Sequence, residues 1–591
     1  MTGRPTLFLD DVVAGRLTVF GAPRAVIRAD RPDELVPALA ALESALQAGN
    51  FVAGYFSYEA GYALEPRLAA RMPPRAVPLA WFGVYEAPQT VDDTALAAWQ
   101  SGRAYAGPLA PEWDAAAYGA RFDKVKALIA AGDIYQANLT FRAGFAFAGD
   151  PLALFARLRR AAGGRYGAYV DDGVRQILSL SPELFFEVSG GVIRTKPMKG
   201  TAARGADPVA DSLARNGLAE STKNRAENLM IVDLMRNDFG RIAEIGSVAV
   251  ADLFAVETYP TVHQMVSTVS ARLKPGIGAA GLVKALFPCG SVTGAPKIRA
   301  MEVIADLEST PRGVYCGAVG FFAPDGTARF NVAIRTLTIN GDRGELGIGG
   351  AVVQDSEDAA EYTEALLKAR YFTTTHRPLE LIETLRWSAA EGFVRRDLHL
   401  DRMATSASAL GLHFDRTRAL DVLDEAVFAL ALPDQPRVAH RLRLTLDEAG
   451  EIACTTARCG PAPEVWTCSI SPERVTSTDT LARHKTNWRD LYEAEFARSG
   501  VDEVVFLNQH GAVVEGSRSN VFVVRDGLLL TPPLAAGALD GVLRRALMAE
   551  GRAVETTLMP QDLQGEFYLG NSLRGLIRGR LTPPLLPPGH K

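Results

Sequence analysis

The side chain in this sequence that is best placed to act as a nucleophile is Lys199. It lies in the segment KPMKGT (residues 196–201), after a strand-like apolar run at residues 185–195, and Gly200 leaves room for a ligand near the main chain. A lysine amine is a good nucleophile only when burial or nearby positive charge lowers its pKa well below about 10.4, and Lys196 offers such a charge. A lone lysine in a turn is usually a solvated surface residue, so the interpretation depends on what accompanies it.

An ordered series of motifs surrounds Lys199 and runs through most of residues 110–372. Its segments are GDIYQAN (132–138), SPELFF (181–186), RAENLMIVDL (225–234), VHQMVS (262–267), GSVTGAPK (290–297) and DSEDAAEYTEALLK (355–368). This series resembles the chorismate-utilising enzymes, and most closely the family of aminodeoxychorismate synthase component I, also called para-aminobenzoate synthase component I.

The residue type at position 199 distinguishes the members of that family from one another. The resemblance implies that anthranilate synthases carry alanine here, so that ammonia attacks C2 of chorismate directly. In the para-aminobenzoate branch a lysine attacks C2 as the C4 hydroxyl leaves, and ammonia then enters at C4 and expels the lysine. The sequence therefore predicts amination at C4, and an anthranilate or isochorismate-type synthase is the alternative.

The same resemblance assigns roles to further residues. Glu183 is the general acid or base, and the apolar residues that follow it favour the raised pKa that this role needs. His263 matches the active-site histidine. Residues that hold the substrate, with its two carboxylates, are predicted to be Ser291, Tyr315, Arg335, Gly349 and Gly350. An arginine fork suits a carboxylate better than a lysine does.

A magnesium site is predicted from three glutamates. Glu227, Glu361 and Glu364 match the metal-site carboxylates of the family, and Mg²⁺ prefers oxygen ligands. Glu361 and Glu364 lie three positions apart on a helix predicted over residues 358–371, so they share a face. Without Glu227 and the family pattern, this pair would read as a solvated acidic helix end.

The second part of the chain, residues 379–580, carries another set of motifs. They are LHLDRM (398–403), RHKTNWR (483–489), VEGSRSNVF (514–522) and GNSLRG (570–575). In this order they resemble 4-amino-4-deoxychorismate lyase, a pyridoxal-phosphate enzyme of fold-type IV. The opening strand and turn of stand-alone lyases are absent or replaced, because the matching sequence begins directly at residue 381.

The lyase resemblance implies a complete binding set for pyridoxal phosphate. Lys485 is the Schiff-base lysine, Glu515 is the partner of the pyridine nitrogen, and Arg402 contacts the phosphate, with Val542 and Ser572 as helpers. Two alternatives stay open for this part: a transaminase of the same fold type, and a degenerate domain with a structural role only. A homodimer through this C-terminal domain is compatible with either.

Composition limits the classes of function. The 591 residues are 48% hydrophobic and 22% charged with a net charge of −5, which describes a globular protein and argues against a general nucleic-acid binder. We recognise no signal peptide and no run of about 20 apolar residues, so we expect a cytoplasmic protein without membrane association. The Gly-x-Cys-x-Gly elbow of a glutamine amidotransferase is absent, so ammonia is expected from a separate amidotransferase subunit or from solution.

These observations together predict an α+β protein made of two modules. Residues 1–110 form the N-terminal part of a synthase component I, and residues 111–375 form its chorismate-binding domain of large antiparallel sheets flanked by helices. Residues 379–580 form a fold-type IV domain, and residues 581–591 form a tail. The predicted function is the synthesis of 4-aminobenzoate for folate from chorismate and ammonia, with Mg²⁺ and pyridoxal phosphate as cofactors.

Overall fold

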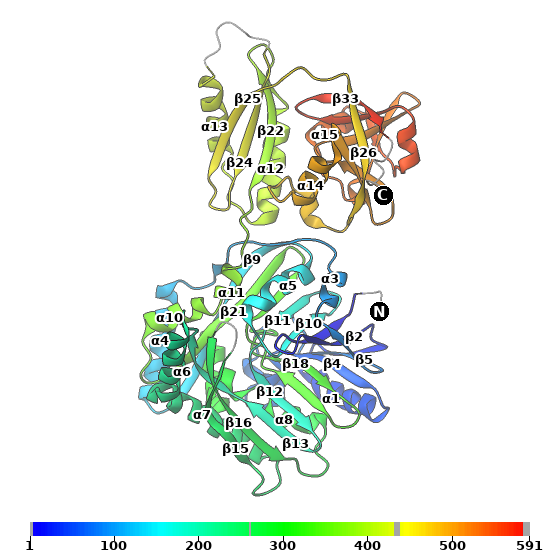
Figure 1. Ribbon diagram of the computed structural model, residues 1–591. Coiled ribbons are helices and arrows are strands. Elements are labelled where there is room, and N and C mark those ends of the chain that lie inside the picture. Colours follow the sequence, from blue (N-terminus) through cyan, green and yellow to red (C-terminus); the bar gives the residue numbers. More distant parts are fainter. Residues whose placement is uncertain (1–3, 259–261, 431–437, 583–591) are drawn as a thin grey trace. The chain divides into compact units, whose positions relative to one another are not determined.

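The computed structural model describes residues 4–258, 262–430 and 438–582, and within it the chain divides into two compact units (Figure 1). Unit 1 comprises Met1–Gln100, Leu109–Phe145 and Pro151–His376. Unit 2 comprises Ser101–Pro108, Ala146–Asp150 and Arg377–Lys591. The predicted tail lies outside the described residues from position 583 onward. No helix in the described part of the chain has the length and apolar character that crossing a bilayer requires.

One large sheet has eleven strands, in the order β17-β9-β21-β20-β11-β10-β1-β2-β6, with β7 and β8 also paired to β9. Their bounds are β1 (Leu7–Asp11), β2 (Arg16–Phe20), β6 (Gln89–Asp92), β7 (Ala104–Ala106), β8 (Ala110–Pro111), β9 (Gln136–Gly149), β10 (Gly167–Asp171), β11 (Gln176–Ser179), β17 (Gly294–Ala295), β20 (Thr336–Asn340) and β21 (Arg343–Val352). Strand β7 and the last residues of β9 belong to unit 2, and the other strands belong to unit 1.

A second sheet in unit 1 has ten strands, in the order β14-β16-β13-β12-β19-β18-β4-β5-β3, with β15 paired to β16. Their bounds are β3 (Ala25–Ala29), β4 (Phe51–Phe56), β5 (Ala80–Tyr85), β12 (Leu184–Ser189), β13 (Val192–Lys196), β14 (Met198–Ala203), β15 (Ala249–Thr258), β16 (Val262–Arg272), β18 (Ala318–Phe322) and β19 (Ala328–Asn331). The strand-like run at residues 185–195 is confirmed as the β12–β13 hairpin. Both sheets include strands from the first hundred residues, which are therefore built into the same architecture.

The helices of unit 1 are α1 (Pro32–Gln47), α2 (Ala60–Leu64), α3 (Ala95–Trp99), α4 (Ala115–Ala130), α5 (Pro151–Ala162), α6 (Pro208–Glu220), α7 (Thr222–Gly240), α8 (Ala279–Leu286), α9 (Lys297–Leu307), α10 (Asp358–Leu367) and α11 (Arg370–Thr373). Apolar residues of α1, α7 and α8 pack with the ten-stranded sheet in one buried cluster. The Asp114 side chain caps α4 by accepting from the backbone of Ala117 at 2.8 Å. The single helix predicted over residues 358–371 is instead two helices, α10 and α11, with a break between them.

Unit 2 contains a four-stranded sheet and an eight-stranded sheet. The first has the order β23-β22-β24-β25, and the second has the order β28-β27-β26-β33-β32-β29-β30-β31. The strands are β22 (Leu381–Ser388), β23 (Gly392–Val394), β24 (His440–Leu446), β25 (Ile452–Arg458), β26 (Val465–Val475), β27 (Glu503–Asn508), β28 (Val513–Gly516), β29 (Asn520–Arg525), β30 (Leu528–Thr531), β31 (Ala553–Glu555), β32 (Phe567–Asn571) and β33 (Gly575–Leu581).

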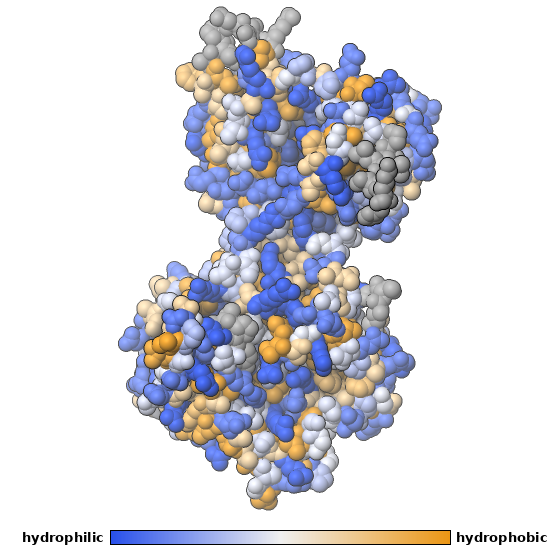
Figure 2. Space-filling view, viewed as in Figure 1, coloured by the Kyte–Doolittle hydropathy of each residue, from blue (hydrophilic) through white to orange (hydrophobic). Residues whose placement is uncertain are grey.

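The helices of unit 2 are α12 (Arg396–Leu410), α13 (Arg416–Phe428), α14 (Asp490–Ser499) and α15 (Val542–Ala549), with a short 3₁₀ helix η3 (Thr480–Arg483) before α14. The eight-stranded sheet mixes parallel pairs, such as β26 with β27, and antiparallel pairs, such as β29 with β32. The predicted α+β class is confirmed. On the face drawn in Figure 2, hydrophilic residues are spread over each unit between smaller apolar areas.

Candidate active sites

Lys199 lies in a strand and not in the turn that the sequence predicted. Strand β14 pairs with β16, but the register shifts between Met198 and Thr201, so Lys199 and Gly200 form a bulge. Gly200 has φ +83°, and a Cβ atom there would lie 2.8 Å from Cγ of Asn224. A bulge adds a residue to one strand and re-aims its side chains. The pairing with β16 therefore turns the lysine out of the regular alternation of β14.

Loss of hydration is the largest cause that lowers the pKa of Lys199, and the positive charge of Lys368 lowers this pKa further. The charges of Glu227, Glu364 and Glu183 act in the opposite direction. The structure thus brings the predicted nucleophile, the predicted acid–base residue and two of the predicted metal-site glutamates into one electrostatic neighbourhood.

The cation beside Lys199 differs from the predicted one. Lys196, at the end of β13, is ion-paired with Glu257 of β15. Lys368, at the C-terminal end of α10, donates a hydrogen bond to the backbone oxygen of Gly349 at 2.8 Å and pairs with Glu364 at 3.0 Å. The sequence analysis missed Lys368, although it lies four positions after Glu364, the spacing that brings two side chains together on a helix.

Glu183 has the properties of an acid–base group at neutral pH. Its side chain is 5% exposed, and loss of hydration raises its pKa to about 7, against a hydrogen bond from Ser291 and the charge of Lys199. The Ser291 hydroxyl also lies 3.2 Å from Sγ of Cys289. Ser291 and Glu183 therefore form a buried polar pair next to the lysine.

Gly350 of the predicted glycine pair lies close to two charged side chains, Glu361 on α10 and Lys368 just after it. A Cβ atom on Gly350 would lie 3.1 Å from Nζ of Lys368 and 3.3 Å from Oε2 of Glu361. Glu361 is buried and accepts a hydrogen bond from Ser356 at 2.7 Å, and burial raises its pKa. The absence of a side chain at Gly350 keeps open the space in front of these two charged groups.

The three predicted metal-site glutamates are not gathered into a coordination cluster. Among the residues that the structure describes, no group of three or more histidine, cysteine, aspartate or glutamate side chains lies close enough to hold a metal ion. Glu227 on α7 lies 4.0 Å from Lys223, and Glu364 is paired with Lys368. Their oxygen donors match the preference of Mg²⁺.

His263 has partners other than the Lys199 group. It is 1% exposed on β16, with Nε2 2.9 Å from Asp211 of α6 and Nδ1 3.0 Å from the hydroxyl of Thr258. Arg204 pairs with the same Asp211, which holds the pKa of this carboxyl well below its usual range. Because both ring nitrogens have partners, the orientation of the imidazole is fixed.

Tyr315 and Arg335 lie on neighbouring segments. The backbone N–H of Cys316, next to Tyr315, donates to the backbone oxygen of Ala333, two residues before Arg335, at 2.9 Å. Burial raises the pKa of Tyr315 well above its usual value, so its hydroxyl stays neutral. Arg335 has φ +50° and donates to the backbone oxygen of Ala162 at 2.8 Å. No described contact joins either residue to Lys199.

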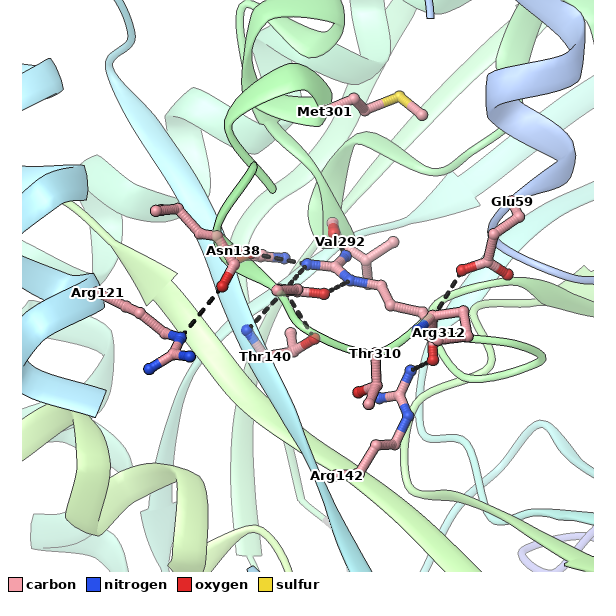
Figure 3. A network of polar contacts seen from close by, with 12 residues as sticks. Glu59, Arg121, Asn138, Thr140, Arg142, Val292, Met301, Thr310 and Arg312 are labelled. Atoms are coloured by element: carbon pink, nitrogen blue, oxygen red, sulfur yellow. Dashed lines mark hydrogen bonds and ion pairs between the residues drawn. The ribbon is translucent and has the colours of Figure 1, made fainter. Parts of the chain in front are cut away.

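A buried ionic network holds the segment that carries Tyr315 (Figure 3). The guanidinium of Arg312 donates twice to Glu308, at 2.8 and 2.6 Å, and also to the backbone oxygens of Val292 and Asn138. The backbone of Arg312 donates to Glu59 at 2.7 Å. These bonds satisfy the charge of an arginine that is only 3% exposed, which a buried cation requires.

Unit 2 contains a cavity of about 680 Å³. All five residues predicted to bind pyridoxal phosphate line it, namely Lys485, Glu515, Arg402, Val542 and Ser572. Its lining also includes five further arginines, Arg441, Arg443, Arg489, Arg518 and Arg574. The volume is in the range of small-molecule sites, and the excess of cationic residues favours an anionic occupant.

Lys485 has an amine that is poised to react. Its Nζ donates to the hydroxyl of Thr384 at 3.0 Å, and loss of hydration lowers its pKa to about 7. The charge of Glu383 opposes this change, and the charges of Arg402, Arg489 and Arg443 add to it. At neutral pH a large fraction of this lysine is therefore the neutral nucleophile.

Glu515 is held as a buried carboxyl that can take a proton. It accepts hydrogen bonds from the hydroxyl of Tyr492 at 3.0 Å and from the backbone of Leu539 at 2.9 Å. Loss of hydration raises its pKa to about 6. Both oxygens have partners, so the carboxyl has a fixed orientation in the cavity wall.

Glu383, which was not among the predicted site residues, organises the end of the cavity where Arg402 and Ser572 lie. Glu383 of β22 is 2% exposed and accepts two parallel hydrogen bonds from Arg402, at 2.8 and 2.7 Å. It also lies 2.6 Å from Nδ1 of His399, whose Nε2 is 2.9 Å from the hydroxyl of Ser572. The motif at residues 398–403 contains His399, but the partner carboxylate lies in a preceding strand. Arg402 keeps N–H groups that Glu383 does not use.

The backbone of α15 completes this end of the cavity. Gly541 and Val542 begin the helix and line the cavity, and a Cβ atom on Gly541 would lie 1.8 Å from Oδ1 of Asn520. Free N–H groups at a helix start favour anions. The residues present therefore fit pyridoxal phosphate: a lysine with a lowered pKa, a buried carboxyl, and an anion-binding end.

Comparisons with known proteins agree with this geometry. Residues 5–374 match the family described as chorismate binding enzyme, and residues 380–581 match amino-transferase class IV. The chain belongs to the chorismate binding enzyme family. Its second part carries an aminotransferase class IV domain, and that domain contains the cavity with Lys485.

Curated relatives of this chain include aminodeoxychorismate synthases from two bacteria. Aminodeoxychorismate synthase component 1 of Klebsiella aerogenes is 44% identical over 292 residues, which are 49% of this chain and 62% of that protein. The protein of the same name from Escherichia coli K12 is 45% identical over 251 residues, which are 42% of this chain and 55% of that protein. The chain thus spans less than two thirds of the length of these relatives.

Solved structures support the fold of unit 1. Anthranilate synthase component I from Streptococcus pneumoniae TIGR4 is 25% identical, with a TM-score of 0.53. The comparison covers 63% of this chain and 92% of that one.

Proposed function

We propose that unit 1 makes 4-amino-4-deoxychorismate from chorismate and ammonia. The observation that carries this proposal is the Lys199 amine, with its lowered pKa, beside Glu183, whose pKa is about 7. A lowered pKa increases the fraction of the amine that is neutral and nucleophilic, and a carboxyl with a pKa near 7 can both give and take a proton. The curated relatives named above are aminodeoxychorismate synthases, which supports the choice of amination at C4.

The proposed reaction has two substitutions. Nζ of Lys199 bonds to C2 of chorismate, the ring double bonds shift, and the C4 hydroxyl leaves as water with a proton from Glu183. Ammonia then bonds to C4, the double bonds shift back, and the bond between C2 and Nζ breaks. The entering nitrogen loses a proton, and the departing lysine gains one, so that chorismate and ammonia become the amino product and water.

The remaining predicted residues would bind the substrate and a metal. Ser291, Tyr315, Arg335 and the glycine pair 349–350 supply hydroxyl, guanidinium and backbone donors for the two substrate carboxylates. The oxygens of Glu227, Glu361 and Glu364 suit Mg²⁺, which when bound would offset the negative charge of a substrate carboxylate. His263 is proposed as the active-site histidine, with its imidazole held in place by Asp211 and Thr258.

We propose that unit 2 removes pyruvate from the product of unit 1 and releases 4-aminobenzoate. Support comes from the single cavity that gathers Lys485, Glu515, Arg402, Val542 and Ser572. Pyridoxal phosphate, when bound, supplies the electron sink for this chemistry. Lys485 would hold the cofactor, Glu515 would be the partner of its ring nitrogen, and Arg402 with the start of α15 would hold its phosphate.

The residues of unit 2 also account for the proton transfers. The amine of Lys485, with a pKa near neutrality, would be the base that takes the proton from the substrate carbon that bears the amino group. Arg441 and Arg443 lie two positions apart on β24, and Arg443 is directly opposite Thr384, the partner of Lys485. Two cations at this spacing suit a substrate with two carboxylates, which favours the lyase over a transaminase of general specificity.

Ammonia would come from a separate glutamine amidotransferase; the words "component 1" in the names of the relatives indicate that those proteins work with another component. The deciding experiment is to give the purified chain chorismate, Mg²⁺, ammonium and pyridoxal phosphate and to identify the product. Free 4-aminobenzoate supports both proposals. Accumulated 4-amino-4-deoxychorismate would refute the lyase proposal alone, and anthranilate would refute amination at C4.

A further inference from the structure

Unit 2 contains two pieces of chain from the first half of the sequence. Residues 101–108 and 146–150, here called the inserted hairpin, pair as β7 and the end of β9, with Tyr105 opposite Ala148. Asp150 ties the hairpin together, since its backbone donates to Arg103 at 2.7 Å and its carboxylate accepts from the backbone of Ser101 at 2.7 Å. The class IV match begins only at residue 380, so this hairpin is outside it.

The inserted hairpin packs into a buried apolar cluster that also contains residues of β22. Tyr105 is fully buried and Ala148 is 7% exposed, and both belong to the buried cluster that contains Leu381, Leu481 and Trp488. The ring of Tyr105 meets the indole of Trp488 edge to face, with centroids 6.0 Å apart. A plain surface connection would not place an aromatic ring in this core.

Three polar contacts of the hairpin reach the segment that carries Lys485. The Arg103 guanidinium donates to the backbone oxygen of Trp488 and lies 3.4 Å from the carboxylate of Asp479. The backbone of Gly149 donates to the hydroxyl of Thr480 at 2.8 Å. Asp479 and Thr480 lie five to six residues before Lys485, and Trp488 lies three residues after it. The hairpin therefore fixes the segment on both sides of the lysine.

A second set of contacts holds the same segment from β22. The backbone N–H of Ile382 donates to the backbone oxygen of Lys485 at 2.8 Å, and the backbone N–H of Asn487 donates to the backbone oxygen of Glu380 at 3.0 Å. The amine of Lys485 then reaches Thr384 of the same strand. Strand β22 and the hairpin therefore hold the backbone segment of Lys485 from two sets of contacts, and Thr384 orients its amine.

We propose that Arg103 and Tyr105 are positioning residues of the second site, acting on Lys485 through Trp488, Asp479 and Thr480. The inference rests on the proposed function of Lys485 as the residue that holds pyridoxal phosphate. It means that the class IV domain is complete only with a segment that the first half of the chain supplies. A mutation far from Lys485 in the sequence would then impair the second reaction and leave the first intact.

The test uses the full chain with Arg103→Met, Arg103→Lys and the matched control Arg525→Met. Arg525 makes an ion pair of similar length with Asp562, at 3.0 Å, elsewhere in unit 2. Three quantities are measured: the affinity for pyridoxal phosphate from its visible absorbance, the pH dependence of its capture by Lys485 after borohydride reduction and peptide mapping, and the consumption of chorismate.

Arg103→Met should lower the cofactor affinity about tenfold, the factor that corresponds to one lost charge-assisted hydrogen bond. The pH for half-maximal capture should rise, because a loosened Lys485 regains hydration and its pKa increases. Arg103→Lys should restore part of both effects, since it keeps the charge beside Asp479. Arg525→Met should match the wild type, and all variants should consume chorismate at the wild-type rate.

Two results would overturn the proposal. One is a folded Arg103→Met protein with wild-type affinity and pH dependence. The other is an unchanged pH dependence together with a lower unfolding temperature of the cofactor-free protein, which would make the hairpin a structural brace only. If the wild type itself captures no pyridoxal phosphate, the proposed function of unit 2 fails, and this inference fails with it.

Discussion

The buried pair of Ser291 and Glu183 allows a sharp test of the first site. The Ser291 hydroxyl donates to the ionised form of the Glu183 carboxyl and so lowers its pKa against the effect of burial. Ser291→Ala removes this donor and leaves the apolar surroundings of the carboxyl in place. The charged form loses stabilisation and the neutral form does not, so the pKa of Glu183 must rise.

The size of this rise follows from the energy of the lost bond. A hydrogen bond to a charged group contributes about 1.5–3 kcal/mol, and about 1.4 kcal/mol corresponds to one pKa unit. The pKa of Glu183, about 7 in the native protein, should therefore increase by about one to two. Water that enters the space of the hydroxyl would offset part of the loss, so the lower figure is the working expectation.

The assay should avoid ammonia, because its own protonation changes over the same pH range. We would mix saturating chorismate with the chain in the absence of ammonium and follow the mass adduct on the peptide that contains Lys199. Its rate should rise as Lys199 loses its proton and fall as Glu183 ionises. In Ser291→Ala the falling limb should move to higher pH, and in Glu183→Gln it should disappear. A falling limb at the same pH in all three proteins would refute the role of Glu183 as the acid.

Further predictions concern the two lysines and the buried network. Lys199→Ala should abolish formation of 4-amino-4-deoxychorismate in a folded protein, and an unchanged rate, measured by chromatography of the product, would exclude the lysine as nucleophile. Lys485→Ala should remove the visible absorbance of bound pyridoxal phosphate and halt 4-aminobenzoate release, while chorismate is still consumed and the amino intermediate accumulates; loss of chorismate consumption would contradict separate sites. Glu308→Gln should lower the free energy of unfolding of unit 1 by about 3 kcal/mol, because it leaves the charge of Arg312 buried and uncompensated. The matched change Glu302→Gln, in a partly exposed pair with Arg299 on α9, which ends just before Glu308, should cost less than about 1 kcal/mol in the same denaturant titration.

The local pattern around Lys199 predicted much of its setting. The apolar run before it gave the hairpin of β12 and β13, and the motif order placed Glu183 and Glu227 in its electrostatic neighbourhood. The bulge at Lys199 was not predictable, because it arises from pairing with β16, more than 60 residues later in the chain. The identity of the neighbouring cation also depends on this pairing, and that is why the nearby Lys196 was the wrong choice.

The same distinction between local and distant partners applies to unit 2. The motif spacing was sufficient to name five residues that line one cavity. Glu383 was missed because the carboxylate in a strand before the motif has no local signature of burial or pairing. The inserted hairpin was missed because β7 is only three residues long and the contact of Arg103 with Trp488 spans 385 positions of the sequence.

The two buried lysines, Lys199 and Lys485, have lowered pKa values for the same physical reasons, although they lie in different units. In each site burial lowers the pKa of the amine, a second cation assists, and a carboxylate limits the change: Lys368 and Glu227 for Lys199, and Arg402 and Glu383 for Lys485. Without the carboxylate, the buried amine would face uncompensated positive charge, and without burial its pKa would lie closer to the usual value of a lysine. In both sites the lysine also depends on a backbone constraint that the rest of the fold imposes, a bulge against β16 in unit 1 and two flanking sets of contacts in unit 2. The position of each amine is therefore determined by the tertiary structure, while its chemistry is determined by the few charges that this structure brings beside it.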